Sequence, residues 1–166
     1  MADFGELVEH YTNTALIQIQ RIEVNKKQSV KHLCNVTVAP LIRTANSRKA
    51  DFSSKQTMQV GESAMANLAI GIMGLKPNIA IQGTTKGDSS KILYVNVNQD
   101  QTTNIVISTI TNGGGTNAKF SQSISFKNSE RYPFLRLVVT QLTKNSTQYE
   151  QTVADTLNLL KASVLR

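Results

Sequence analysis

Apolar side chains near the start of the chain recur at steps of three and four positions, a spacing that places them on one face of a helix. Asp3 and Glu6 have the spacing of a helix-capping pair, and acidic residues precede basic ones, the order that the helix dipole favours. The pattern predicts one helix over 3–33. Its apolar face would consist of Phe4, Leu7, Val8, Tyr11, Ala15, Ile19 and Ile22.

A strand over 16–24 is the alternative for this segment. Ile17 and Ile19 alternate with glutamines, and Ile22 and Val24 alternate again in the other phase. The slip between the two phases favours the helix. Such a helix would be about 45 Å long, whereas a globule of this size is about 40 Å across. We therefore expect its apolar face to extend beyond its own domain and to be covered by further copies of the chain.

From position 36 onwards, short apolar groups are separated by turn residues, which predicts the strands of an antiparallel sheet or sandwich. The segment 64–75 could be a strand or a helix, and Gly74 followed by Pro77 favours a helix that ends there. The predicted strands cover 36–42, 58–60, 79–81, 92–97, 105–107, 120–126 and 134–139.

A second amphipathic helix is predicted over 147–165. Thr147 and Glu150 have the spacing of a capping box, and Val153, Leu157 and Leu160 follow at helical steps. No linker divides the chain. The predicted fold class is α+β, a single domain over 1–166 with a long N-terminal helix, a β-rich middle over 36–142 and a C-terminal helix.

Composition narrows the classes of function that the chain could have. The chain has 166 residues, of which only 17% are charged, against about 25% in an average protein. No signal peptide or membrane span is apparent, so a cytoplasmic protein is expected, and the lone Cys34 is expected to be a small buried residue. Few charges have to be desolvated when such a surface packs against a neighbour.

Residues for catalysis or metal binding are sparse. His10 and His32 would lie about 33 Å apart on the predicted helix, so they could not share a site. The carboxylates are scattered, and Gly83 to Asp88 lacks the spacing and the lysine of a phosphate-binding loop. We expect no enzyme, no metal, no cofactor and no small-molecule substrate.

Positive charge is the one asymmetric feature. The formal net charge is +7, and the segment 21–55 carries +6 of it. Such a cluster could bind nucleic-acid phosphates or an anionic membrane surface, or it could be a solvated surface. The basic residues are Arg21, Lys26, Lys27, Lys31, Arg43, Arg48, Lys49 and Lys55.

The layout resembles an uncharacterised bacterial family of helix-flanked β domains. The resemblance is carried by 38–42, by 50–55 and by the Val153, Leu157 and Leu160 helix after the last strand. It implies a fold and no functional residue. The leading hypothesis is a non-enzymatic structural protein that self-assembles into a ring, tube or shell. The alternative is a basic binding module or coat protein that contacts nucleic acid or a membrane through 21–55.

Overall fold

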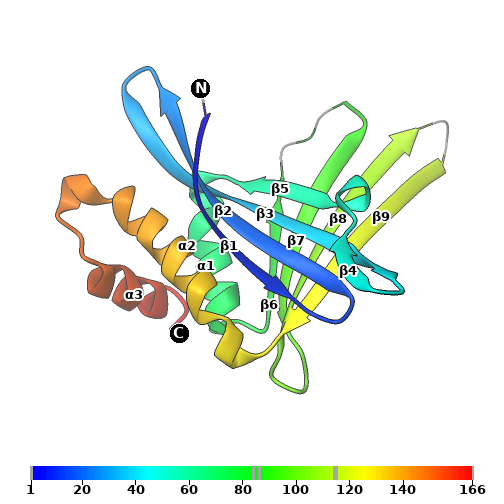
Figure 1. Ribbon diagram of the computed structural model, residues 1–166. Coiled ribbons are helices and arrows are strands. Elements are labelled where there is room, and N and C mark those ends of the chain that lie inside the picture. The colour runs from blue at the N-terminus through cyan, green and yellow to red at the C-terminus, as the bar shows by residue number, and fades with distance from the viewer. Residues whose placement is uncertain (1, 84, 86, 114–115, 166) are drawn as a thin grey trace.

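The computed structural model describes residues 2–83, 85, 87–113 and 116–165. The protein is mostly β, with 51% of the described residues in strands and 28% in helices. Two antiparallel sheets cross each other, and the helices lie together at one side (Figure 1). The predicted α+β class with a long N-terminal helix is therefore wrong.

The first sheet is built on a long ribbon. β1 pairs with β2, β2 pairs with β3, and β3 also pairs with β4 at its C-terminal end and with β5 at its middle. The strand bounds are β1 Ala2–Tyr11, β2 Ala15–Lys26, β3 Ser29–Thr44, β4 Ser47–Ala50 and β5 Gln56–Val60.

The second sheet is a meander in the order β6-β7-β8-β9. Its inward-facing positions carry branched apolar side chains, such as Leu93, Val95, Ile105 and Ile107, and all four are fully buried. The strand bounds are β6 Asn78–Gln82, β7 Ser89–Val97, β8 Thr103–Gly113 and β9 Thr116–Phe126.

Strands β1 and β2 and the first residues of β3 occupy the segment 3–33, which was predicted as a helix. Phe4, Leu7 and Tyr11 are exposed on β1, whereas Ile19 and Ile22 on β2 are buried against neighbouring strands. Val8 is half-buried and Ala15 is buried, so these seven residues do not share one face. The expectation of a self-assembling structural protein depended on that helix, and it loses its physical basis.

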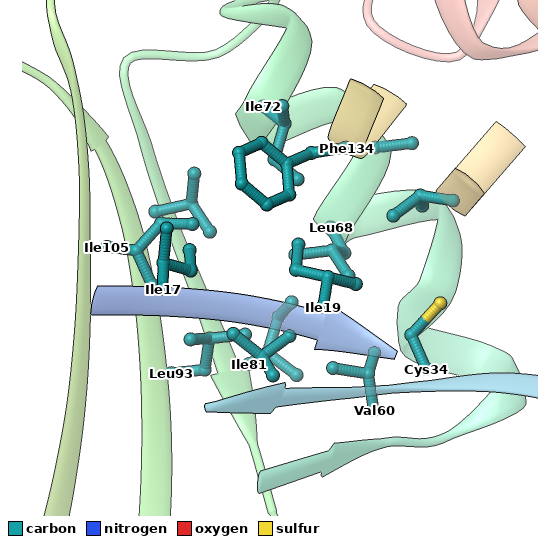
Figure 2. Close-up of a cluster of buried hydrophobic side chains, with 14 of the residues drawn as sticks. Ile17, Ile19, Cys34, Val60, Leu68, Ile72, Ile81, Leu93, Ile105 and Phe134 are labelled. Atoms are coloured by element: carbon teal, nitrogen blue, oxygen red, sulfur yellow. The ribbon is translucent and has the colours of Figure 1, made fainter. Parts of the chain in front are cut away.

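Three helices cover the core. α1 (Met65–Met73) packs on β6 and β7, α2 (Tyr132–Lys144) packs on β2 and β3, and α3 (Val153–Ala162) packs on α2. Figure 2 shows side chains of both sheets meeting those of the helices in one apolar cluster. No helix within the described part of the chain is long and apolar enough to cross a bilayer.

Two predicted elements change type or boundary. The apolar run 134–139 belongs to α2, where Phe134, Leu137, Val138 and Gln141 are buried at helical spacing. The helix over 64–75 is confirmed as α1, and it ends at Gly74 with φ 72°. The C-terminal helix starts later than predicted, because its capping box is formed by Thr152 and Asp155.

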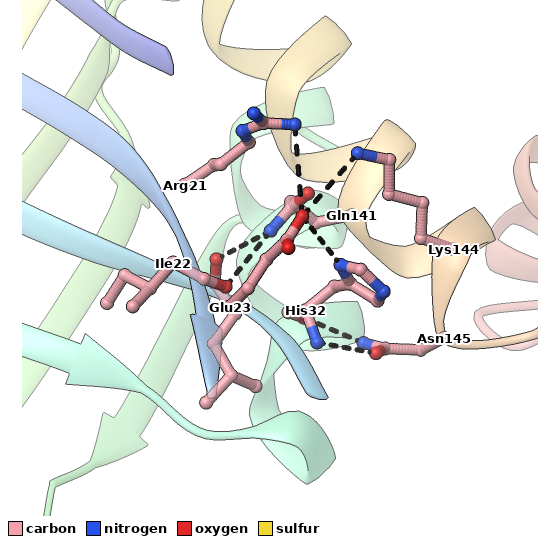
Figure 3. A network of polar contacts seen from close by, with 8 residues as sticks. Arg21, Ile22, Glu23, His32, Gln141, Lys144 and Asn145 are labelled. Carbon is pink, nitrogen blue, oxygen red and sulfur yellow. Dashed lines mark hydrogen bonds and ion pairs between the residues drawn. The ribbon is translucent and has the colours of Figure 1, made fainter. Parts of the chain in front are cut away.

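Polar contacts fix α2 to the β2–β3 ribbon (Figure 3). The Gln141 side chain donates to the carbonyl oxygens of Leu33 at 2.9 Å and Ile22 at 3.3 Å. The Asn145 side chain accepts from the backbone N–H of His32 at 2.8 Å and donates to its carbonyl at 2.7 Å. These bonds to backbone groups set the position of α2 along the ribbon.

Gly71 provides a test of how tightly α1 packs on the second sheet. A Cβ at this position would lie 2.8 Å from Cβ and Cγ1 of Val95. Alanine favours a helix over glycine by about 1 kcal/mol, but overpacking a core costs about 1–3 kcal/mol. We expect Gly71→Ala to lower the urea midpoint. Asn67→Ala, at an exposed position of α1, is expected to raise it slightly, and a rise for both variants would contradict the close packing.

Candidate nucleic-acid interface

The predicted basic cluster is divided between the two ends of the first sheet. β3 has 16 residues, so its ends lie about 50 Å apart. One group is near the β2–β3 hairpin and comprises Arg21, Lys26, Lys27 and Lys31. The other is on or just after the β3–β4 hairpin and comprises Arg43, Arg48, Lys49 and Lys55. A compact ligand can therefore contact only one group at a time.

Carboxylates partly neutralise the first group. Arg21 lies 3.9 Å from Glu23, and the Lys31 ammonium lies 2.9 Å from Glu62. Figure 3 shows Glu23 among cationic side chains, with Lys144 at 4.0 Å. Lys26 and Lys27 are exposed, and no carboxylate oxygen of the described residues lies within 4.0 Å of either ammonium, so this end keeps part of its positive charge.

The second group differs in how its cations are arranged. Arg43 and Arg48 are exposed and lie directly opposite each other in the β3–β4 register. Within the described residues, no carboxylate oxygen lies within 4.0 Å of either guanidinium. The nearby Asp51 is bonded to hydroxyls of its own loop, and hydrogen bonds from Ser53 and Ser54 lower its pKa.

A groove of about 410 Å³ runs beside this second group, between the two sheets. The first sheet contributes Tyr11, Asn13 and Arg48, and the second contributes Lys127. We call it the basic groove. Its remaining lining residues are His10, Thr12, Leu41, Thr102, Ser125, Phe126 and Glu130.

The β1–β2 turn holds the two arginines at the edge of the basic groove. The Thr12 hydroxyl oxygen accepts from the backbone N–H of Ala15 at 3.1 Å and fixes the turn. Arg43 donates to the Asn13 carbonyl oxygen at 3.2 Å, and Arg48 donates to the Asn13 side-chain oxygen at 3.1 Å. Both guanidinium groups are thereby oriented by a neutral residue.

Exposed aromatic rings accompany these cations. Tyr11 is 52% exposed, and it lies opposite Leu16 in the pairing of β1 with β2. Phe52, just after β4, is 46% exposed and has the Lys55 ammonium 5.9 Å from its ring centroid. Cations interleaved with open aromatic faces can bind phosphates and stack on unpaired bases together.

A second groove between the sheets, of about 640 Å³, has a different chemistry. Its described lining is mostly neutral and polar, with Thr57, Gln59 and Gln82 among its residues. Lys91 is its single cation, and it donates to the Thr57 carbonyl oxygen at 2.6 Å. This groove is less suited to a polyanion than the basic groove.

The residues considered for catalysis have structural partners. His10 lies 3.3 Å from Glu130, and His32 lies 3.4 Å from Glu23. Cys34 is buried, as predicted, and burial raises the pKa of its thiol to about 12. Within the described residues, no group of three or more His, Cys, Asp or Glu side chains could hold a metal ion.

Sequence reasoning missed two residues of the basic groove. Asn13 lies between two threonines in a turn, a pattern that indicates the turn but not its partners 30 and 35 positions away. Lys127 follows β9 and reaches the groove only because the two sheets cross. Tyr11 was expected on a self-association face and lines the groove instead.

Comparisons with known proteins identify the fold. No family model and no curated protein matches the chain. WHY3 from Arabidopsis thaliana superposes with a TM-score of 0.63 at 16% identity, over 88% of this chain and 96% of that one. WHY1 from Arabidopsis thaliana gives a TM-score of 0.59 at 17% identity, over 88% and 93%. The plant transcriptional regulator PBF-2 gives 0.59 at 14% identity, over 98% and 99%. The chain shares its fold with these plant proteins, and none of them is a member of an uncharacterised bacterial family.

Proposed function

We propose that the chain is a non-enzymatic protein that binds single-stranded nucleic acid through the basic groove. The observation that carries the proposal is the exposed pair Arg43 and Arg48 beside a groove that also contains Lys127 and Tyr11. Phosphate contacts supply most of the affinity of such proteins, and aromatic side chains stack on unpaired bases. The fold shared with PBF-2, described as a transcriptional regulator, is consistent with a nucleic-acid partner.

Single strands fit this site better than a duplex. Duplex readers usually insert a helix or a two-stranded ribbon into the major groove. The basic groove is formed by strand ends and turns, and α2 has its apolar side buried against the sheet. Exposed rings such as Tyr11 and Phe52 gain stacking energy only from bases that are not already paired.

The test is fluorescence anisotropy with a labelled oligothymidylate of about 20 nucleotides, beside a duplex of the same length. We expect tighter binding of the single strand. The logarithm of the affinity should fall with the logarithm of salt with a slope of about −2, for about three neutralised phosphates. The pair Arg48→Gln and Lys127→Gln should weaken binding by about tenfold, because each glutamine removes a positive charge but can still donate a hydrogen bond to a phosphate.

The matched control is Lys26→Gln with Lys27→Gln, which removes the same charge at the other end of the ribbon. These two lysines are exposed near the β2–β3 turn, so we expect a loss of less than about twofold from long-range charge alone. Equal losses for both pairs, or no binding at low salt, would contradict the proposal. Vesicles of phosphatidylserine serve as a further arm, and binding to them in preference to the oligonucleotide would favour a membrane partner.

A further inference from the structure

Arg43 and Arg48 occupy an arrangement that is unfavourable in the free protein. They are a directly opposed pair across two antiparallel strands, where like charges repel. Both are also drawn toward a single residue, Asn13, by bonds of 3.2 Å and 3.1 Å to its two oxygens. The fold therefore gathers two cations at one point without giving them an acid.

We propose that Arg43 and Arg48 form a clamp for one phosphate group of the bound strand, with Asn13 as its positioning residue. This inference rests on the proposed function and identifies the atoms that hold the backbone. A guanidinium has five N–H donors in a planar fork that matches phosphate oxygens. Each arginine uses one bond on Asn13, so further donors remain for a ligand. The adjoining pocket is lined by Arg43, Thr44, Asn46, Ser47 and Arg48.

An asparagine at position 13 suits this role better than an aspartate would. Its oxygens accept from both guanidinium groups and orient them, but they leave both positive charges uncompensated. An aspartate would orient the same groups and neutralise one charge. It would relieve the repulsion in the free protein and reduce the attraction for phosphate. Asn13→Asp thus separates the positioning of the arginines from their charge.

The experiment compares Asn13→Asp with Asn25→Asp, which makes the same charge change at an exposed position near the β2–β3 turn. We expect Asn13→Asp to weaken oligothymidylate binding by about tenfold, and Asn25→Asp by less than about twofold. Asn13→Ala should weaken binding with little change in the salt slope, because both cations are retained. Thermal melting of each variant establishes that it is folded. Equal losses for the two aspartate variants would overturn the clamp.

A second measurement separates this inference from the proposed function. Inorganic pyrophosphate is titrated into the wild-type protein, and the Nε–Hε signals of its arginines are followed by NMR. We expect the Arg43 and Arg48 signals to shift before that of Arg21, which lies beside Glu23. Shifts at Arg43 and Arg48 without oligonucleotide binding would support the clamp and refute the nucleic-acid function. Oligonucleotide binding by a protein whose Arg43 and Arg48 signals do not respond to pyrophosphate would refute the clamp alone.

Discussion

Replacing both Arg43 and Arg48 by glutamate is expected to lower the affinity for oligothymidylate by about 100-fold or more at low salt. Two charged hydrogen-bonding contacts, worth about 1.5–3 kcal/mol each, would be lost. Two carboxylates would then face the phosphates, and like charges in contact with a polyanion reduce binding further. Anisotropy at about 50 mM salt measures the change, and the salt slope of any residual binding should become shallower by about 0.7, because the pair holds one phosphate.

The control for this reversal is Lys26→Glu with Lys27→Glu. It changes the net charge by the same amount, but about 50 Å along the ribbon, several Debye lengths from the basic groove. We expect it to reduce affinity by less than about fivefold at that salt concentration. A reduction as large as that of the arginine pair would mean that only the overall charge matters. The circular dichroism spectrum of both variants should match that of the wild type, because all four side chains are exposed.

The N-terminal segment shows why strands can be mistaken for a helix. The register of β1 against β2 shifts between Phe4 and Leu7, so an extra residue enters the alternation. The turn after Tyr11 and the start of β2 at Ala15 add another step of four. A bulge and a tight turn therefore produce spacings of three and four in a chain that has a period of two. The pairing that fixes the alternation of β2 comes from β3, whose register with β2 does not show in the spacing of apolar residues along 3–33.

Local sequence signals were sufficient to predict an element where the residues of that element alone determine its structure. The glycine at position 74 has φ 72°, so the helix over 64–75 ends where the sequence indicates. The segment 147–165 contains two cap-like spacings, and Thr152 with Asp155 forms the cap that begins α3. At the earlier spacing, Thr147 and Glu150, the backbone of Glu150 has φ 54°, so a helix cannot continue through this residue. Choosing between equivalent local signals requires the tertiary contacts.

The candidate site was predictable in part. An excess of positive charge over 21–55 is visible in the sequence, but β3 spans the middle of that segment and sends its two halves to opposite ends of a sheet. How far the first group is neutralised depends on residues of other elements: Glu62 pairs with Lys31, whereas Lys144 adds a cation beside Glu23. The basic groove depends on β9 crossing the ribbon, which brings Lys127 beside Arg48.

The position where β9 crosses the ribbon depends on the packing of the core. Phe134 is the core side chain whose replacement tests this most directly. It is 1% accessible to solvent and its ring lies 5.4 Å from the ring of Phe126, at the end of β9. Figure 2 shows it reaching from α2 toward Ile72 and the strands. We expect Phe134→Ala to cost about 3–5 kcal/mol, because the lost burial and the cavity both destabilise the fold.

Urea unfolding measures the lost stability, and in thermal unfolding the melting temperature should fall by roughly 10 °C or more for a chain of this size. Tyr132→Ala is the matched control, since Tyr132 lies in the same helix and is 68% exposed. It should change stability by less than about 0.5 kcal/mol. Because Phe126 also lines the basic groove, the Phe134 variant should bind oligothymidylate more weakly even at temperatures where it is folded. Full stability of Phe134→Ala would show that α2 does not join the two sheets, and the placement of the groove would then need another explanation.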